Sequence, residues 1–211
     1  MFREEAQWIK TVLENIKPPP ANNKVANTGA SSAFFREKIQ PHINDCVILP
    51  VIGNGWTVVH IDLKQHDGVD IVADIANDLF GRQYKDQFAL TLCTNMLEHV
   101  DDISIAADNL LAATVLNGYI LITVPYKYKL HYDPVDNGFR PSPEQIAELF
   151  PYKSVQVLDS AVITISEKAY YSVKKSRFPL WGYRERLQYY LGKRYKVSGT
   201  LLQVIKKETG I

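Results

Sequence analysis

The apolar residues of this chain follow a helical period at its start and form short continuous runs further on. Residues 3–16 place five apolar side chains at helical spacing: Ala6, Ile9, Val12, Leu13 and Ile16. This stripe predicts an amphipathic helix. Three prolines at 18–20 end it, because proline lacks the amide hydrogen that a helix interior needs. Residues 103–115 repeat the helical spacing and predict a second long helix.

Short apolar runs bounded by turn residues predict strands at 24–28, 56–62, 68–75, 87–93, 119–124, 155–165 and 195–205. Further helices are expected at 33–39, 143–150 and 183–191. Ser31 or Ser32 would cap the first of these and Ser142 the second. Residues 41–55 fit a strand or a helix, and Pro41 and Pro50 interrupt either.

Strands and helices alternate over most of the chain. Alternation predicts an α/β fold, in which parallel strands are joined by helical crossovers that cover both faces of the sheet. We see no repeat or linker, so residues 1–211 are expected to form a single domain, with an N-terminal helix and linker at 1–20 and a basic portion at 161–211. In such sheets ligands bind at the carboxyl ends of the strands.

Charge is distributed unevenly, although the net charge is only +1. Residues 161–211 hold 11 Lys or Arg against 3 Asp or Glu, whereas the first 160 residues hold 13 against 20. A solvated basic face explains this distribution. The functional alternative is contact with an anionic substrate or with an anionic membrane surface.

No apolar run approaches the roughly 20 residues of a membrane span, and the charged N-terminus lacks the apolar stretch of a secretory signal. Cys46 and Cys93 each lie in an apolar run. This placement favours buried free thiols over a disulfide framework or a zinc site. We therefore expect a cytoplasmic protein without a bound metal.

Three predicted strands end in residues that suit cofactor binding. The first runs into Asn27-Thr28-Gly29-Ala30-Ser31-Ser32, a turn of small residues whose backbone amides can approach a ligand closely. Asp62 ends the second strand, where a carboxylate can accept both hydroxyls of a ribose. Asp74 ends the third, where a carboxylate could accept an adenine amino group. An ordinary turn and two helix-capping carboxylates are the structural alternatives.

The most specific stretch is Cys93–Asp102, after the fourth predicted strand. It places small polar and flexible apolar side chains, then Glu98 and His99, at the approach to a helix. Histidine as a residue type titrates near neutral pH, which suits a general base, so His99 is a candidate base, and the alternative is a structural histidine. The loop after the fifth strand adds Tyr126 and His131, and forms either a substrate lid or an ordered surface loop.

Three stretches together resemble bacterial class I methyltransferases that use S-adenosylmethionine (SAM), and most closely the small methyltransferase-like proteins of surface-polysaccharide gene clusters. They are GVDIVADI (68–75), LCTNMLEHVDD (92–102) and GYILITVPYKYKLHYDPVDNGFRPSPEQIAELFP (118–151). The resemblance covers roughly residues 24–151, and the C-terminal hairpin more loosely. It implies a Rossmann-like, seven-stranded, mostly parallel sheet with an antiparallel C-terminal hairpin. SAM would lie across the strand ends, with S-adenosylhomocysteine as the product.

The resemblance also assigns residues to cofactor binding. Gly29 and its neighbours match a glycine-rich loop, Asp62 the acidic residue for the ribose, and Asp74 the adenine side. The loop departs from the family pattern, because Asn27 takes the place of an acidic residue and Gly29 is its one glycine. In chain order, the candidates are Asn27, Gly29, Ala30, Ser31, Asp62, Asp74, Ile75, Thr94, Asn95, Met96, Leu97 and Glu98.

These features predict methyl transfer from SAM to a small molecule or glycan, such as a sugar or polysaccharide end. For a hydroxyl acceptor, His99 or His131 is the expected base, with Tyr126 as the residue that orients it. The rival is a non-catalytic binding or scaffold protein with the same fold. A nicotinamide enzyme is not favoured, because no G-x-G-x-x-G follows the first strand. Nucleic acid is not favoured either, because no Asn/Asp-Pro-Pro-aromatic element is present. Nothing in the sequence indicates the oligomeric state.

Overall fold

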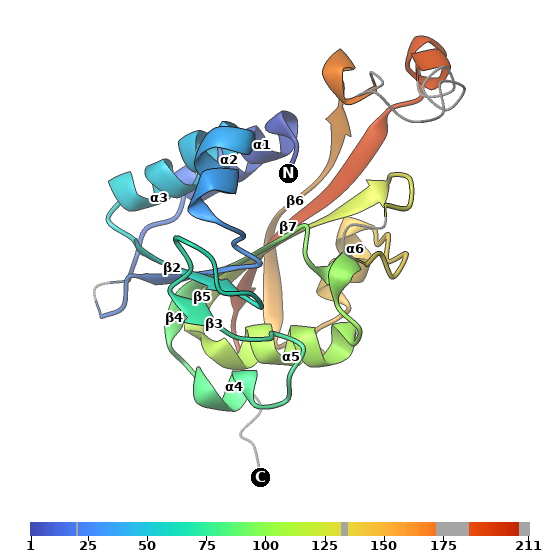
Figure 1. The fold of residues 1–211 in the computed structure, drawn as a ribbon. Helices are drawn as coiled ribbons and strands as arrows, with labels where there is room; N and C mark the ends of the chain where they lie inside the picture. Colours follow the sequence, from blue (N-terminus) through green and yellow to red (C-terminus); the bar gives the residue numbers. More distant parts are fainter. Residues whose placement is uncertain (20, 132–134, 172–185, 207–211) are drawn as a thin grey trace.

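Seven strands form one sheet in a computed structural model that describes residues 1–19, 21–131, 135–171 and 186–206 (Figure 1). They are β1 (Lys24–Thr28), β2 (Thr57–Asp62), β3 (Ile71–Val72), β4 (Phe88–Thr94), β5 (Thr114–Lys127), β6 (Val155–Ile165) and β7 (Tyr195–Val204). Their order across the sheet is β3-β2-β1-β4-β5-β7-β6. The first five strands pair in parallel, and β7 is antiparallel to both β5 and β6. The predicted mostly parallel sheet with an antiparallel C-terminal hairpin is confirmed.

Helices cover both faces of the sheet, as predicted (Figure 1). On one face lie α1 (Arg3–Glu14), α2 (Pro41–Ile43) and α3 (Leu49–Gly53), and on the other α4 (Phe80–Gln83), α5 (Ile103–Ala113) and α6 (Pro143–Ala147). Side chains alternate across a strand, so Val25 of β1 packs in the core under α1 whereas Ala26 packs in the core under α5. The two cores fix the strands from opposite sides.

The stretch 41–55, which the sequence left open, is helical. It contains α2, a π-helical turn at Asn44–Ile48 and α3. Pro41 and Pro50 lie in the first turns of α2 and α3, where a missing amide hydrogen leaves no intrahelical bond unmade. Val47, Ile48 and Val51 are buried together, at helical spacing. A second π-helical turn, Phe35–Ile39, follows β1. Ser32 Oγ accepts a hydrogen bond from the Phe35 amide at the start of this turn, 3.2 Å away.

Two strands differ in length from their predictions. The expected segment 68–75 pairs only over Ile71–Val72, at the edge of the sheet where it has a single neighbour. The fifth strand starts at Thr114, five residues earlier than expected, because α5 leads into it directly. A register shift opposite Phe88 to Leu90 accommodates the extra residues. Of the predicted helix 183–191, residues 186–190 are helical and 183–185 lie outside the described residues.

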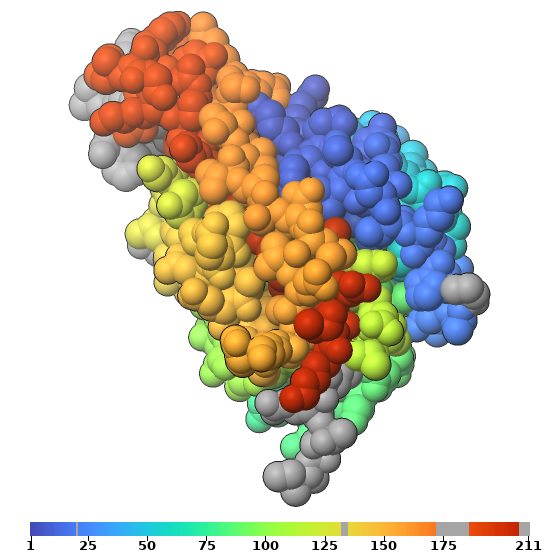
Figure 2. Space-filling view, turned by 180° about the vertical axis from the view of Figure 1, so that it is seen from behind, coloured from blue at the N-terminus to red at the C-terminus, as the bar shows by residue number. Residues whose placement is uncertain are grey.

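The opposite side of the molecule shows β6 at the free edge of the sheet (Figure 2). Its segment (orange) runs between the N-terminal helices (blue) and the residues around α6 (yellow). Across residues 1–19, 21–131, 135–171 and 186–206, no helix combines the length and the apolar character needed to span a membrane. Cys46 and Cys93 are both free, and burial raises the pKa of the Cys93 thiol to about 12.

A buried carboxylate fastens α1 to the ends of the two central strands. Glu5 lies in the stripe of α1 that faces the sheet, and its side chain is fully buried although it is acidic. Its Oε1 accepts hydrogen bonds from Asn95 Nδ2 (2.5 Å) and Thr123 Oγ1 (2.6 Å), and its Oε2 accepts from the Phe2 amide (3.0 Å). Three donors therefore compensate the loss of hydration of one carboxylate.

We expect Glu5→Ala to lower the free energy of unfolding by about 2–4 kcal/mol, because it leaves buried donors without an acceptor. Glu14→Ala is the matched control. Glu14 lies on the same helix, is 53% exposed and faces Lys10 at 3.9 Å, so its loss should change stability by less than about 0.5 kcal/mol. Urea denaturation of both variants measures the difference. Equal, small effects would contradict a structural role for Glu5.

Candidate active site

The loop after β1 packs directly against the segment after β4. Gly29 has a φ of +68°, a conformation that glycine adopts without steric cost. A Cβ atom on Gly29 would lie 3.1 Å from Met96 Cγ. The close approach of these two candidates joins the ends of β1 and β4.

The same loop is joined to the end of β2. The Ser31 amide donates to Asp62 Oδ2 (2.7 Å), and Asp62 Oδ1 accepts from the Lys64 amide (3.0 Å). Ser31 has a φ of +57°, in the left-handed region where a residue with a side chain is strained. The buried guanidinium of Arg36 donates to the carbonyl oxygens of Ala30 (2.9 Å) and Ser31 (2.6 Å). Arg36 thereby fixes the backbone of the loop.

Asn27 is buried near the end of β1 and points at a histidine. Its Nδ2 lies 3.0 Å from Nδ1 of His60, its neighbour on β2. An amide donor facing Nδ1 requires that this nitrogen carry no proton. Burial, together with the charge of Arg36, lowers the pKa of His60 to about 4. The pair is therefore neutral at physiological pH.

The two candidates for the adenine side lie just beyond β3. The Ala73 amide donates to the Asp62 carbonyl (3.0 Å), which brings the following residues next to the end of β2. Asp74 is exposed, and its Oδ1 accepts from the Ala76 amide (2.8 Å). Ile75 is buried in the core under α5. The Asp74 carboxylate remains open to solvent, whereas the Ile75 side chain does not.

The segment after β4 turns sharply at its second residue. Thr94 ends the strand, and Asn95 has a φ of +49° with its side chain donating to Glu5. Met96 reaches toward Gly29, and Leu97 is fully buried in the core under α5. Of these four candidates, Met96 faces the loop after β1, whereas the other three belong to the structure of the turn.

Glu98 and two histidines form a polar cluster beyond this turn. Glu98 Oε1 lies 3.8 Å from His99 Nε2, and the rings of His99 and His131 meet edge to face with centroids 5.1 Å apart. The Glu98 side chain is 1% exposed, and burial raises its pKa to about 8. Burial also lowers the pKa of His131. The structure thus brings together three candidates that lie up to 33 residues apart in the chain.

Residues 135–140 hold this cluster in place, and the sequence assigned no role to them individually. Asp136 has a fully buried side chain and accepts from Arg140 Nη2 (2.6 Å), Arg140 Nη1 (3.1 Å) and the amides of His131 and Gly138 (both 2.9 Å). Burial alone would raise the pKa of Asp136, but these hydrogen bonds hold it well below its usual range. Asn137 Nδ2 donates to the carbonyl oxygens of Leu97 and Val100, both at 2.8 Å.

Among the described residues, Tyr126 makes no ring contact with either histidine. It lies near the end of β5, with Lys127 Nζ 5.9 Å from its ring centroid. Within the described residues, the rings recorded against His131 are those of His99 and Tyr128. Residues 132–134 of the expected lid lie outside the described residues.

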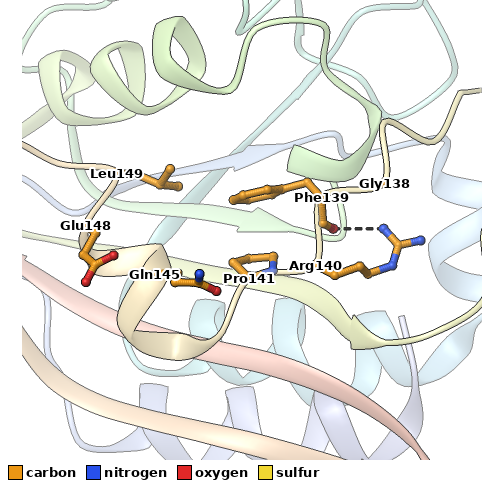
Figure 3. Close-up of a pocket in the computed structure, with 7 residues that line it drawn as sticks. All are labelled: Gly138, Phe139, Arg140, Pro141, Gln145, Glu148 and Leu149. Carbon is orange, nitrogen blue, oxygen red and sulfur yellow. Dashed lines mark hydrogen bonds between the residues drawn. The ribbon is translucent and has the colours of Figure 1, made fainter.

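An open hollow of about 430 Å³ lies beside the segment that holds the cluster. Figure 3 shows Phe139 and Leu149 pointing toward one another across it, with Gln145 and Glu148 of the α6 region on one side. Arg140 also lines it, and the same guanidinium binds Asp136. The hollow is therefore connected to the cluster through two side chains, because Arg140 binds Asp136 and Asp136 lies 2.9 Å from His131.

No protein-family model matches this chain, and no curated protein matches it. Solved structures do. A geranyl diphosphate methyltransferase in complex with SAM superposes with a TM-score of 0.60 at 9% identity, over 96% of this chain and 85% of that one. A Burkholderia thailandensis 1,6-didemethyltoxoflavin N1-methyltransferase, with bound 1,6-didemethyltoxoflavin and S-adenosylhomocysteine, gives 0.55 at 13% identity, over 97% and 78%.

The 4+2 cyclase SpnF superposes about as well, with a TM-score of 0.56 at 11% identity over 94% of this chain and 80% of that one. At such identities the likeness shows the fold alone. The chain therefore has the Rossmann-like fold of SAM-dependent methyltransferases, and the polar residues described above lie at the carboxyl ends of its parallel strands. That fold also carries a cyclase, so the chemistry has to be argued from the residues.

Proposed function

We propose that this protein is a SAM-dependent methyltransferase that acts on a small molecule. The observation that carries the proposal is the convergence of three strand ends. Gly29 packs on Met96, and the Ser31 amide binds Asp62, so the ends of β1, β2 and β4 line one edge of the sheet. Ligands bind at this edge in sheets of this type.

The residues present suit SAM. An ionised carboxylate offers about four acceptor positions, and the two backbone amides on Asp62 leave room for both hydroxyls of a ribose. Asp74, whose carboxylate is open to solvent, would accept the adenine amino group. Asn27, Ala30, Thr94 and Met96 would line the methionine end.

SAM supplies an activated methyl group when it is bound. The protein orients the acceptor in line with that group and excludes water, an effect worth up to roughly 7–11 kcal/mol. For a hydroxyl acceptor, a base at the cluster takes up the proton. His131 suits this role, because burial lowers its pKa and keeps the ring neutral at pH 7. His99 is the second candidate, and Tyr126 would orient the acceptor from β5.

We infer that the acceptor is a small molecule, with a sugar or glycan end as the finer proposal. The basic portion at 161–211 would contact an anionic acceptor or an anionic membrane surface. Acceptor binding should then weaken as salt is raised, and salt-independent binding would contradict this part of the proposal. Free Cys46 and Cys93 suit a reducing compartment, and we place the reaction in the cytoplasm.

A second candidate function is a binding or scaffold protein that uses the fold without methyl transfer. The pairing of Asn27 with His60 favours it, because an amide held by a neighbouring side chain is less available to a cofactor. The strain at Ser31, within a loop where the family pattern has more than one glycine, favours it as well. The two functions differ in whether SAM binds.

Asp62→Ala should weaken SAM binding about tenfold or more, since it removes hydrogen bonds to a charged acceptor. Isothermal titration calorimetry measures the affinity. Asp159→Ala removes the same charge from exposed β6 and should leave the affinity unchanged. Asp62→Asn keeps an acceptor for the Ser31 amide, so it tests whether the loss reflects the loop or the ribose contact. No binding of millimolar SAM to the wild type would favour the scaffold function.

His131→Ala should lower kcat about 100-fold or more once an acceptor is known, because the proton then has no base. His66→Ala, which removes an exposed histidine outside the cluster, should leave kcat unchanged. Since burial lowers the pKa of His131, kcat/KM should rise with pH, and the midpoint of the rise should lie below the 6.5 of an unperturbed histidine. Unchanged turnover in both His99→Ala and His131→Ala would remove the proposed base.

A further inference from the structure

The cluster of Glu98, His99 and His131 has the composition of a metal site. One ligand atom from each residue lies within 4.8 Å of the other two. Two imidazoles and one carboxylate are a common set of three protein ligands at catalytic zinc sites. The residues come from two segments, the 3-10 turn Leu97–His99 and the loop after β5, so the fold itself assembles them.

Glu98 lacks the partner that a buried carboxylate needs. Both of its oxygens are buried, and neither has a hydrogen-bond partner. Glu5, also fully buried, differs in having three donors. A carboxylate that accepts no hydrogen bond is costly to bury in its ionised form, and His99 Nε2, at 3.8 Å, is too far away to donate one. A cation at the cluster would supply the missing counter-charge.

Both histidines have an acceptor near Nδ1, which leaves Nε2 for a ligand. His99 Nδ1 is hydrogen-bonded to the Val135 carbonyl oxygen. His131 Nδ1 is buried and lies 2.9 Å from Asp136 Oδ2, without the alignment of a hydrogen bond. An acceptor facing Nδ1 favours the proton on that nitrogen and leaves the lone pair on Nε2. Histidines that bind metals are oriented in this way by a carboxylate or a backbone carbonyl.

We propose that Glu98, His99 and His131 bind one divalent transition-metal ion, such as Zn²⁺, with a fourth position open toward solvent. The His99 and His131 side chains are 20% and 30% exposed, which gives the ion a path of entry. At bond lengths of about 2.1 Å, tetrahedral ligands lie roughly 3.4 Å apart. The ion would therefore draw the side chains together from their present separations by rotation. This proposal replaces the absence of a metal that the two cysteines suggested.

Metal binding at this cluster does not rest on SAM binding, and it can be tested with the metal alone. Where it holds, the two histidines are ligands, and the open position would take an oxygen of the acceptor. The effect of His131→Ala on turnover would then reflect loss of the metal. Added Zn²⁺ would raise the activity of chelator-treated wild-type protein and not that of the variant.

The experiment is calorimetric titration of chelator-treated full-length protein with ZnCl₂, with Co²⁺ absorption as a report on geometry. We expect one ion per chain and a visible band of four-coordinate Co²⁺. A 100-fold excess of Zn²⁺ over Kd should raise Tm by roughly 5–10 °C. Glu98→Gln, which keeps the side-chain size and removes the charged ligand, should weaken Zn²⁺ binding at least 10-fold. Its Tm without metal should not fall, because the glutamine is neutral.

His66→Ala and Cys46→Ser are the matched controls, each removing a metal-binding side chain outside the cluster. Both should keep the wild-type affinity. Two results would overturn the proposal: no Zn²⁺ binding by the wild type, or equal binding by wild type, Glu98→Gln and His131→Gln. The second would place the ion elsewhere and leave Glu98 as a buried, protonated acid.

Discussion

The carboxylate of Glu5 connects the first helix of the chain to the point where the central strands end. It accepts hydrogen bonds from the side chains of Asn95, one residue after β4, and of Thr123 on β5. The Asn95 amide also donates to the Thr123 carbonyl oxygen. These bonds hold Asn95 in a left-handed conformation. That turn directs Met96 toward Gly29 and Glu98 into the interior. The contact between Met96 and Gly29 and the position of Glu98 therefore both depend on Glu5, which lies about 90 positions before Asn95 in the chain.

Elsewhere at this edge, polar side chains hold backbone segments. Arg36 binds the carbonyls of the loop after β1, and Asn137 binds those around the 3-10 turn. Arg140 fixes Asp136, which in turn contacts His131. These hydrogen bonds use up the polar groups that hold the backbone. The groups that can still bind a ligand are the Asp62 carboxylate, the exposed Asp74 carboxylate, and the cluster of Glu98 with two histidines. They are the groups on which binding and chemistry are proposed.

The sequence predicted the sheet because its signals are local. Apolar runs, a helical stripe and strand-end carboxylates are visible within short windows, and the resemblance added the antiparallel hairpin. The sequence could not show whether residues 41–55 are helical. A proline fits a helix only in its first turn, and the sequence did not show where the helices in this stretch begin. Glu5 did leave a signal, since it occupies a position in the apolar stripe of α1, but its partners are distant. Asp136, Asn137 and Arg140 act through contacts that no local pattern shows.

Hydrogen–deuterium exchange with and without SAM tests the account most directly. The central claim is that the ends of β1, β2 and β4 form one cofactor site on this fold. SAM should then slow exchange in residues 27–33, 61–64 and 94–98 together, because bound ligand shields amides and suppresses local opening. Protection that falls elsewhere, or no change at saturating SAM, would contradict the claim.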